Sequence, residues 1–337
     1  MNSNIELIST VNMTNDEWLN YRYSGIGASE VSSILGLNQY KSSIELFYEK
    51  IGYTQRYNIE NMACFMGKEQ EAFVADLWKY WDGSQESMIL NYRANKIVRK
   101  CQRVNAYARN PKYPHLFVSL DRKINKHGNK EEGALEIKTM GGYEANKWEA
   151  GIPIGHIMQL QTQLQVCEFD YGELAILTDG RQFDVYPFDK VQGICDTIVE
   201  RTHLFWQRVE KAKVLVNQKF EFERNFNMVQ AEKVRAEIES YEPEADGSDA
   251  YTKFLKEKYK NAKLGGRLGN DAEKQFAINS KNLAEQIKIL EEEKNKNENL
   301  IKKSMGEIQT LDFGSSGKVH WTLDAKGGRR FSNKIKL

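Results

Sequence analysis

The chain has 337 residues, with 48 Lys and Arg against 47 Asp and Glu, which leaves a formal net charge of +1. That length is enough for one large domain or two ordinary ones. Apolar residues make up 40% and charged residues 28% of the chain, which excludes a disordered tail and a bilayer protein. The near-zero charge excludes a uniformly basic protein that coats nucleic acid. If nucleic acid is bound, the contacts must be local.

The start of the chain and the cysteines point to one compartment. The first residues lack the basic and apolar regions of a signal peptide. The four cysteines, Cys64, Cys101, Cys167 and Cys195, are scattered without paired spacing, so we expect neither a disulfide framework nor a zinc knuckle. A reducing cytoplasm fits best.

Helical and strand patterns alternate over the first two thirds of the chain, which predicts a mixed α/β unit. We expect helices over 15–23, from 28 onward, over 41–50 and over 66–81. Strands are expected over 87–92, 97–98, 115–121 and 134–139, then helices over 143–150 and 153–166. Strands over 174–178 and 182–187 and a helix over 190–213 complete the unit.

The composition changes after residue 240, where an acidic linker over 241–248 precedes a Lys-, Glu- and Asn-rich stretch over 249–303. We expect this stretch to be a long helix or a helical pair with a thin apolar stripe that polar residues interrupt. It is either an oligomerisation or partner-docking arm or a solvated hairpin packed on the core. The last twenty residues hold six Lys and Arg against one acid and are expected to form a hairpin that turns at 326–328.

The most informative chemistry lies in two predicted strands. Asp121 ends one strand, and fourteen residues later Glu136 and Lys138 lie two apart in the next, so these two side chains share a face. If the strands pair, two carboxylates and an ammonium come together, which suits a Mg²⁺ ion that activates water for phosphodiester hydrolysis. Lys138 would orient or deprotonate the water and stabilise charge on the phosphate. The alternative is an ordinary edge-strand ion pair.

Three further segments complete an ordered set of motifs. They are Trp18-x₃-Arg22-x₃-Ile26-x-Ala28-Ser29-Glu30, then Gly67-x₃-Glu71, then Gln159-Leu160-Gln161 after the Asp121 and Glu136-Ile137-Lys138 pair. In this order they resemble the phage lambda-type exonucleases, and most closely the YqaJ-like viral recombinase branch of the PD-(D/E)xK nuclease superfamily. The resemblance spans roughly residues 15–170. It implies an α/β fold with a central mixed sheet flanked by helices, to which the rest of the sequence adds a C-terminal helical extension and a small β-hairpin.

The resemblance also implies roles for matching residues. Asp121, Glu136 and the Ile137 carbonyl would hold Mg²⁺, for which Mn²⁺ is expected to substitute, and Lys138 would be the catalytic lysine. Glu71 would supplement the metal site, with Glu69 as its rival, and Gln159 would complete the site. By their spacing, Gln161 and Gln163 are expected to face elsewhere, on the helix surface or against the DNA backbone.

Arg22 and Ser29 resemble the pocket for a 5′-terminal phosphate, which an Arg fork and a hydroxyl at a helix start can bind. The alternatives are a surface charge for Arg22 and a simple helix N-cap for Ser29. Arg122 departs from the family pattern, which usually has Gly at that position.

We therefore expect a Mg²⁺-dependent exonuclease on linear double-stranded DNA, encoded by a phage or prophage. By resemblance it would digest 5′ to 3′, leave 3′ overhangs for a single-strand annealing protein, and form a trimeric or tetrameric ring. The expected domains are an exonuclease domain over 1–220, a helical extension over 221–310 and a basic hairpin over 311–337, whose tail contacts duplex backbone or merely aids solubility. The alternatives are a Cas4-like or restriction-type endonuclease, or a non-catalytic DNA-binding assembly protein; the scattered cysteines do not match the clustered set of the Cas4-like proteins.

Overall fold

A computed structural model describes residues 4–54, 61–126, 131–142, 151–261, 265–323 and 327–335. The chain divides into two compact units, Met1–Asn261 and Ala262–Leu337. Each unit is mixed in its secondary structure, which confirms the predicted α/β class. In the part of the chain that is described, no helix is both long and apolar enough to cross a membrane.

A five-stranded mixed sheet with the order β3-β6-β7-β8-β9 forms the centre of the first unit. The pair β7–β8 is parallel, and the other neighbours are antiparallel. Its strands are β3 (Cys101–Gln102), β6 (Arg122–Asn125), β7 (Glu132–Met140), β8 (Tyr171–Thr178) and β9 (Gln182–Asp189). Every residue of β8 except the last is buried, as expected for a strand covered on both faces.

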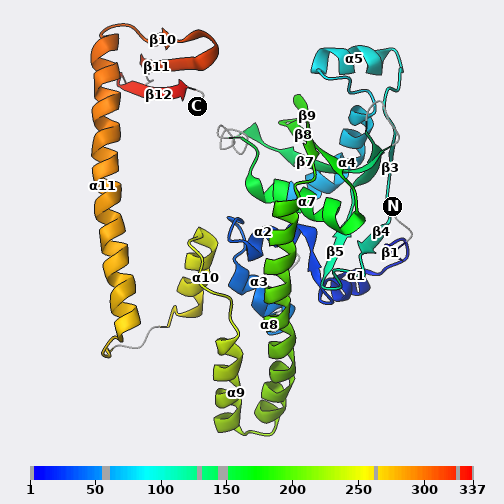
Figure 1. The fold of residues 1–337 in the computed structure, drawn as a ribbon, viewed down its shortest axis with the longest axis vertical. Helices are drawn as coiled ribbons and strands as arrows, with labels where there is room; N and C mark the ends of the chain where they lie inside the picture. The colour runs from blue at the N-terminus through cyan, green and yellow to red at the C-terminus, as the bar shows by residue number, and fades with distance from the viewer. Residues whose placement is uncertain are drawn as a thin grey trace. The chain divides into compact units, whose positions relative to one another are not determined.

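Helices cover both faces of this sheet, so the predicted central sheet flanked by helices is confirmed (Figure 1). On one face Leu135 of β7 shares a core with Trp78 of α4 (Met62–Trp78). On the other, Ala134 shares a core with Leu164 of α7 (Ile154–Cys167). Because strand side chains alternate between faces, the even-numbered residues of β7 point toward α7.

A smaller sheet has the order β1-β4-β5-β2, and its strand β5 is followed directly in the chain by β6 of the central sheet. Its strands are β1 (Glu6–Ser9), β4 (Ala106–Arg109), β5 (Leu116–Ser119) and β2 (Ile26–Gly27). The short helices beside it are α1 (Asn15–Arg22), η1 (Ala28–Glu30), α2 (Val31–Ile34) and α3 (Ser43–Lys50). Since β5 ends at Ser119 and β6 begins at Arg122, residue Asp121 lies where the two sheets join.

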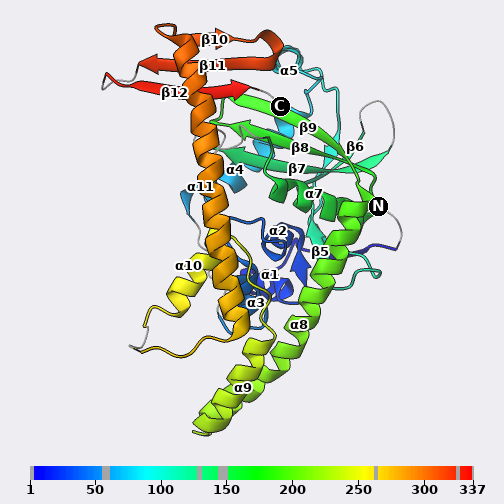
Figure 2. The ribbon, with the colours of Figure 1, turned by 60° about the vertical axis from the view of Figure 1, so that its left-hand side comes forward.

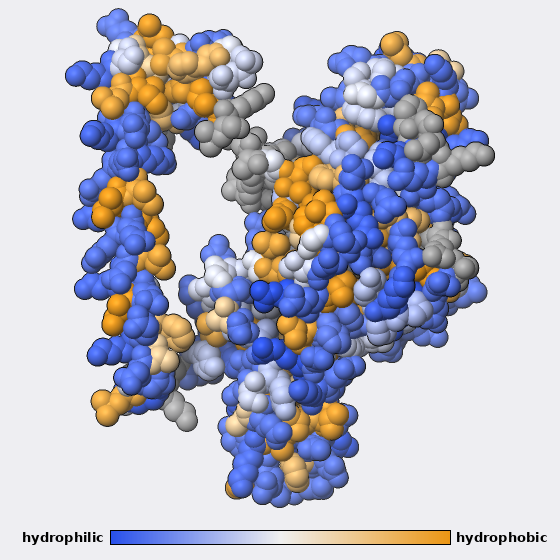
Figure 3. Space-filling model, in the orientation of Figure 1, coloured by the Kyte–Doolittle hydropathy of each residue, from blue (hydrophilic) through white to orange (hydrophobic). Residues whose placement is uncertain are grey.

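Three helices follow the central sheet in the first unit. The helices α8 (Gln192–Arg224) and α9 (Met228–Ser240) form a long hairpin, and α10 (Asp249–Lys258) comes after it. Figures 1 and 2 show the hairpin reaching away from the sheets. At its turn Phe226, Met228 and Val229 are largely exposed, and apolar side chains gather at this end in Figure 3.

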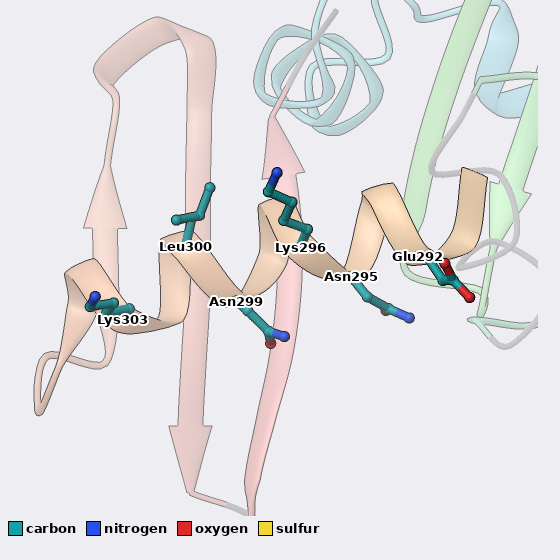
Figure 4. A pocket seen from close by; sticks show the side chains of 6 residues that line it. All are labelled: Glu292, Asn295, Lys296, Asn299, Leu300 and Lys303. Carbon is teal, nitrogen blue, oxygen red and sulfur yellow. The ribbon is translucent and has the colours of Figure 1, made fainter. Parts of the chain in front are cut away.

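The second unit consists of a long helix and a three-stranded antiparallel sheet. Its elements are α11 (Asp271–Met305), β10 (Thr310–Asp312), η3 (Gly314–Ser316), β11 (Gly317–Leu323) and β12 (Arg329–Ile335). The sheet order is β10-β11-β12. The predicted stripe residues Leu283, Ile287 and Leu290 of α11 are exposed. Figure 4 shows the polar side chains and Leu300 that line a shallow hollow along the same helix.

Several expected elements differ from the structure. The segment 87–92 is not a strand but lies in the helix α5 (Gln85–Arg93), because Ser84 caps it and Met88 and Asn91 bury one side. The segment 97–98 is not a strand either; the amides of Val98 and Arg99 both donate to the Lys79 carbonyl. The expected helix over 143–150 lies outside the described residues. The stretch 249–303 is a helical pair, α10 and α11, and the expected C-terminal hairpin gains a third strand, β10.

Candidate active site

The two sheets bring Asp121, Glu136 and Lys138 together. The β6–β7 register places Arg122 opposite Leu135, so Asp121 lies next to the Glu136 position. The Ile137 amide donates to Asp121 Oδ2 at 2.8 Å, and Lys138 Nζ lies 2.7 Å from Glu136 Oε1. Glu136 and Lys138 therefore share a face of β7, as their spacing predicts. Asp121 joins them from the junction before β6, because β7 pairs with β6 and not with the expected strand over 115–121.

Two carboxyl groups so close together in a buried place repel each other. Burial, then the charge of Glu136, raise the pKa of Asp121 well above its usual value, although the Ile137 amide opposes the rise. Burial alone would lower the pKa of Lys138, but the neighbouring Glu136 carboxylate raises it overall. The site therefore has an excess of negative charge that Lys138 alone does not balance.

Helix α7 holds Glu136 from the opposite side with two glutamines one turn apart. Gln159 Nε2 donates to Glu136 Oε1 at 2.7 Å, and its Oε1 accepts from Lys138 Nζ at 3.2 Å. Gln163 Nε2 donates to Glu136 Oε2 at 2.6 Å and to the Ser119 carbonyl at 3.2 Å. The structure thus places Gln159 in the site, whereas the expectation that Gln163 faces elsewhere is wrong.

Gln161 is also not a surface residue. It is buried, its Nε2 donates to the Asp189 carbonyl at 2.9 Å, and its Oε1 accepts from the Val191 amide at 2.8 Å. These bonds join α7 to the start of α8. The helix side that carries Gln161 therefore faces the protein interior, away from Glu136.

Glu71 reaches the site through an arginine that the family pattern does not contain. Arg122 is buried and donates both to Glu71 Oε1 and to the Asp121 carbonyl oxygen. The charge of Glu71 contributes to the raised pKa of Asp121. The rival, Glu69, is exposed. The structure therefore brings Glu71 and not Glu69 to the edge of the site, with Arg122 between it and Asp121.

Arg22 lies in a second group of buried charges, next to β2. Its Nη2 donates to Glu30 Oε1 at 2.9 Å, and its guanidinium lies over the rings of Trp18 and Phe117. Lys50 is completely buried and lies 2.7 Å from Glu30 Oε2. Arg22 is therefore not a surface charge but a side chain fixed by its neighbours.

Ser29 lies close to Arg22 in the sequence but has a different environment. It is exposed, and it is the middle residue of η1, whose N-cap is Gly27. The N-cap alternative for Ser29 is therefore wrong. The amide of Gly27 instead donates to Glu30 Oε2 at 2.8 Å.

The donor set at Asp121 and Glu136 fits Mg²⁺ better than a metal that needs a full protein cage. Among the described residues, no three His, Cys, Asp or Glu side chains gather closely enough to hold an ion. Mg²⁺ uses one or two carboxylates and keeps several waters. Glu136 has about four lone-pair positions and uses three of them for Gln159, Lys138 and Gln163. A lone pair remains, and a cation would relieve the repulsion that raises the pKa of Asp121.

The cysteines do not form a second metal centre. Cys64 is exposed on α4, Cys101 is half-buried in β3, and Cys167 and Cys195 are buried in α7 and α8. None of them is in a disulfide. Their places on four separate elements argue against the four-cysteine ligand set of a Cas4-like protein.

Comparisons with known proteins cover the segment that holds this site. A family model described as "YqaJ-like viral recombinase domain" matches residues 17–170, a range that contains every site residue named above. A protein of Bacillus subtilis (strain 168) described as "Uncharacterized protein YqaJ" is 28% identical over 301 residues, which are 88% of this chain and 80% of that protein.

Solved structures also align with the chain at low identity. An alkaline exonuclease (LHK-Exo) from Laribacter hongkongensis aligns with a TM-score of 0.47 and 16% identity over 61% of this chain and 98% of that chain. A phage-related exonuclease from Haemophilus somnus 129PT aligns with a TM-score of 0.37 and 12% identity over 60% of this chain and 99% of that chain. The family match rests on the sequence, and it is residues 17–170 of the chain that match the YqaJ-like viral recombinase domain.

Proposed function

We propose that the protein is a Mg²⁺-dependent exonuclease that digests linear double-stranded DNA from 5′ to 3′ and leaves 3′ overhangs. The observation that carries this proposal is the convergence of Asp121, Glu136, Lys138 and Gln159 in one hydrogen-bonded network. The four residues come from a strand junction, a strand and a helix of the YqaJ-like domain. An edge-strand ion pair would not need a helix to hold the carboxylate.

Each side chain of the network has a distinct task in this proposal. Asp121, Glu136 and the Ile137 carbonyl would hold Mg²⁺, which supplies a polarised phosphate oxygen and a more acidic water when bound. Lys138 donates hydrogen bonds within the network, so we assign it the orientation of the water and the stabilisation of charge on the phosphate. Gln159 joins Lys138 to Glu136 and keeps both in place.

Arg22 and Ser29 would recognise the 5′-terminal phosphate. Glu30 fixes the Arg22 guanidinium, whose buried Nε has no hydrogen-bond partner among the described residues. Ser29 follows Arg22 in the same motif and is exposed. We expect Arg22→Ala to slow digestion of 5′-phosphorylated duplex at least about tenfold, the loss of one charge-assisted bond. Equal slowing on 5′-hydroxyl duplex would contradict the phosphate pocket.

The biological setting follows from the same proposal. A single-strand annealing protein would receive the 3′ overhangs in a bacterial cell that carries the phage or prophage. A homo-oligomeric ring of three or four copies would keep the enzyme on its substrate. Size-exclusion chromatography with light scattering measures the number of copies, and a monomer in the presence of DNA would contradict the ring.

One gel tests the activity and its direction. Linear duplex labelled at the 5′ end and, separately, at the 3′ end is incubated with and without Mg²⁺. We expect the 5′ label to be released early as mononucleotide while the 3′-labelled strand stays long, and no release in EDTA. Lys138→Ala is expected to remove activity, and covalently closed circles are expected to stay intact. Cleavage of the circles would instead favour a restriction-type endonuclease.

A further inference from the structure

The three-stranded sheet of the second unit has two unlike faces. On one face Val319 is buried, and Trp321 lies opposite Phe331. Arg329 stacks over Trp321 with 3.7 Å to the ring centroid, and it donates to the Gly306 carbonyl at the end of α11. This face is therefore packed, and it attaches the sheet to the C-terminal end of the helix (Figures 1 and 2).

The opposite face is polar at every position. The register β11–β12 places Lys318 opposite Lys334, His320 opposite Ser332, and Thr322 opposite Arg330. The strand β10 adds Thr310 beside His320 and Asp312 beside Lys318. The three cations of this face, Lys318, Arg330 and Lys334, are exposed. We call the eight side chains of this set the polar face of the C-terminal sheet.

Positive charges outnumber negative ones on the polar face. Lys318, Arg330 and Lys334 share it with one acid, Asp312. Asp312 lies 2.8 Å from Lys318, but both side chains are 52% exposed, and such a pair contributes little to stability. An anionic ligand across the face would be attracted by this net positive charge.

The spacing and chemistry of the face favour a repeating anion. Residues two apart along a strand are about 6.7 Å apart, and neighbouring strands are about 4.8 Å apart. Arg330, Ser332 and Lys334 therefore present donors at regular intervals along β12. Hydroxyl and cationic donors are the groups that contact phosphate and sugar without reading sequence. Surfaces that bind single-stranded nucleic acid instead stack bases on aromatic side chains. In this sheet the rings of Trp321 and Phe331 lie on the packed face.

We propose that the polar face of the C-terminal sheet binds the phosphate backbone of duplex DNA through Lys318, Arg330 and Lys334. The hydroxyls of Thr310, Thr322 and Ser332 serve as further donors. This proposal rests on the proposed function, since a nuclease that acts on duplex ends benefits from a second DNA-binding site that does not depend on sequence. The binding is electrostatic, so it weakens steeply with salt.

Equilibrium binding in EDTA tests the proposal without any digestion. The full-length chain and the variant K318Q/R330Q/K334Q are titrated into a fluorescein-labelled duplex of about 30 base pairs at several KCl concentrations. The control variant is K281Q/K288Q/K296Q, which removes the same charge from exposed lysines of α11 (Figure 4 shows Lys296). We expect the slope of log Kd against log[KCl] to fall by up to about 2.7 in the first variant, about 0.9 for each lost phosphate contact. The control slope is expected to stay near that of the wild type.

Three results would overturn the proposal. They are an unchanged slope in the first variant, an equal fall in the control, and a fall that appears with a single-stranded oligonucleotide but not with the duplex. Unchanged melting temperatures show that each variant is folded. A wild-type chain that binds duplex yet releases no nucleotide with Mg²⁺ would refute the nuclease and leave this surface standing.

Discussion

Replacement of Gln163 by Leu tests whether α7 positions the carboxylate of Glu136. Gln163 is completely buried and donates to Glu136 Oε2 at 2.6 Å and to the Ser119 carbonyl at 3.2 Å. Leu fills a similar volume but cannot donate. The substitution therefore leaves a buried carboxylate oxygen without this donor and removes a link between β5 and β7.

The magnitude follows from the kind of bond that is lost. A hydrogen bond to a charged group contributes about 1.5–3 kcal/mol. If Glu136 must be held for the reaction, the same energy appears in the barrier, which corresponds to a fall in kcat of about 10- to 150-fold. The free energy of unfolding is expected to fall by a similar amount, because the unpaired carboxylate stays buried.

Gln165 provides a matched control on the same helix. It is also buried, and its Nε2 donates to the Tyr113 hydroxyl at 2.6 Å, away from Glu136. Gln165→Leu should lower the melting temperature but leave kcat within about threefold of the wild type, because the neutral hydrogen bond that it removes does not reach the reacting groups. Nucleotide release at saturating duplex gives kcat, and thermal unfolding gives stability. Wild-type kcat in Gln163→Leu, or an equal loss of kcat in Gln165→Leu, would refute the positioning role.

Three other substitutions probe the buried charges. Burial and then the charge of Glu136 raise the pKa of Asp121, and Asp121→Asn removes this buried carboxyl group. The melting temperature in EDTA should therefore equal or exceed that of the wild type while nuclease activity is lost, and a large drop in melting temperature would contradict this. Lys50→Met leaves Glu30 with one fewer cation, so denaturant unfolding should show that the free energy of unfolding falls by about 3–5 kcal/mol. A fall below about 1 kcal/mol would mean that the ion pair is dispensable. Burial lowers the pKa of His115 to about 4, so the unfolded chain binds a proton at a higher pH than the folded chain does. The free energy of unfolding should therefore fall as pH drops from 6.5 toward 4, by at most about 1.4 kcal/mol per pH unit. His115→Gln should flatten that dependence, and an unchanged profile would assign it to other groups.

The parts of the site that could be predicted are those that strand geometry determines locally. Glu136 and Lys138 are two apart in a strand, and that alone puts them on one face, where the structure shows them 2.7 Å apart. Asp121 could be placed beside them only by assuming that its own strand pairs with theirs, and that assumption is wrong. The strand before Asp121, β5, pairs with β4 and β2, and the unexpected strand β6, directly after Asp121, is the one that pairs with β7. The roles assigned to these residues stay predictions until activity is measured.

The parts that could not be predicted depend on which face of a helix meets the sheet. Nothing in the sequence alone says that the side of α7 with Gln159 meets Glu136. Gln159 and Gln163 are four apart, however, so a helix places them on one side, and the assignment of Gln159 to the site contradicts the expectation that Gln163 faces elsewhere. Arg122 replaces the usual glycine of the family pattern, and the sequence does not show that it is the buried partner of Glu71. The segment 87–92 alternates apolar and polar residues weakly, and only the cap at Ser84 shows that it begins a helix.

The buried ion pairs also change what the net charge of +1 can say. Lys50 and Arg22 share Glu30, and Arg122 is paired with Glu71. Such pairs cancel inside the protein and leave the total unchanged, so the total reports neither their presence nor the potential at the surface. A near-neutral chain can therefore hold a strongly negative pocket and a positive sheet face at once. Because screening limits exposed charges to about 8–10 Å at physiological salt, DNA would respond to those local groups and not to the sum.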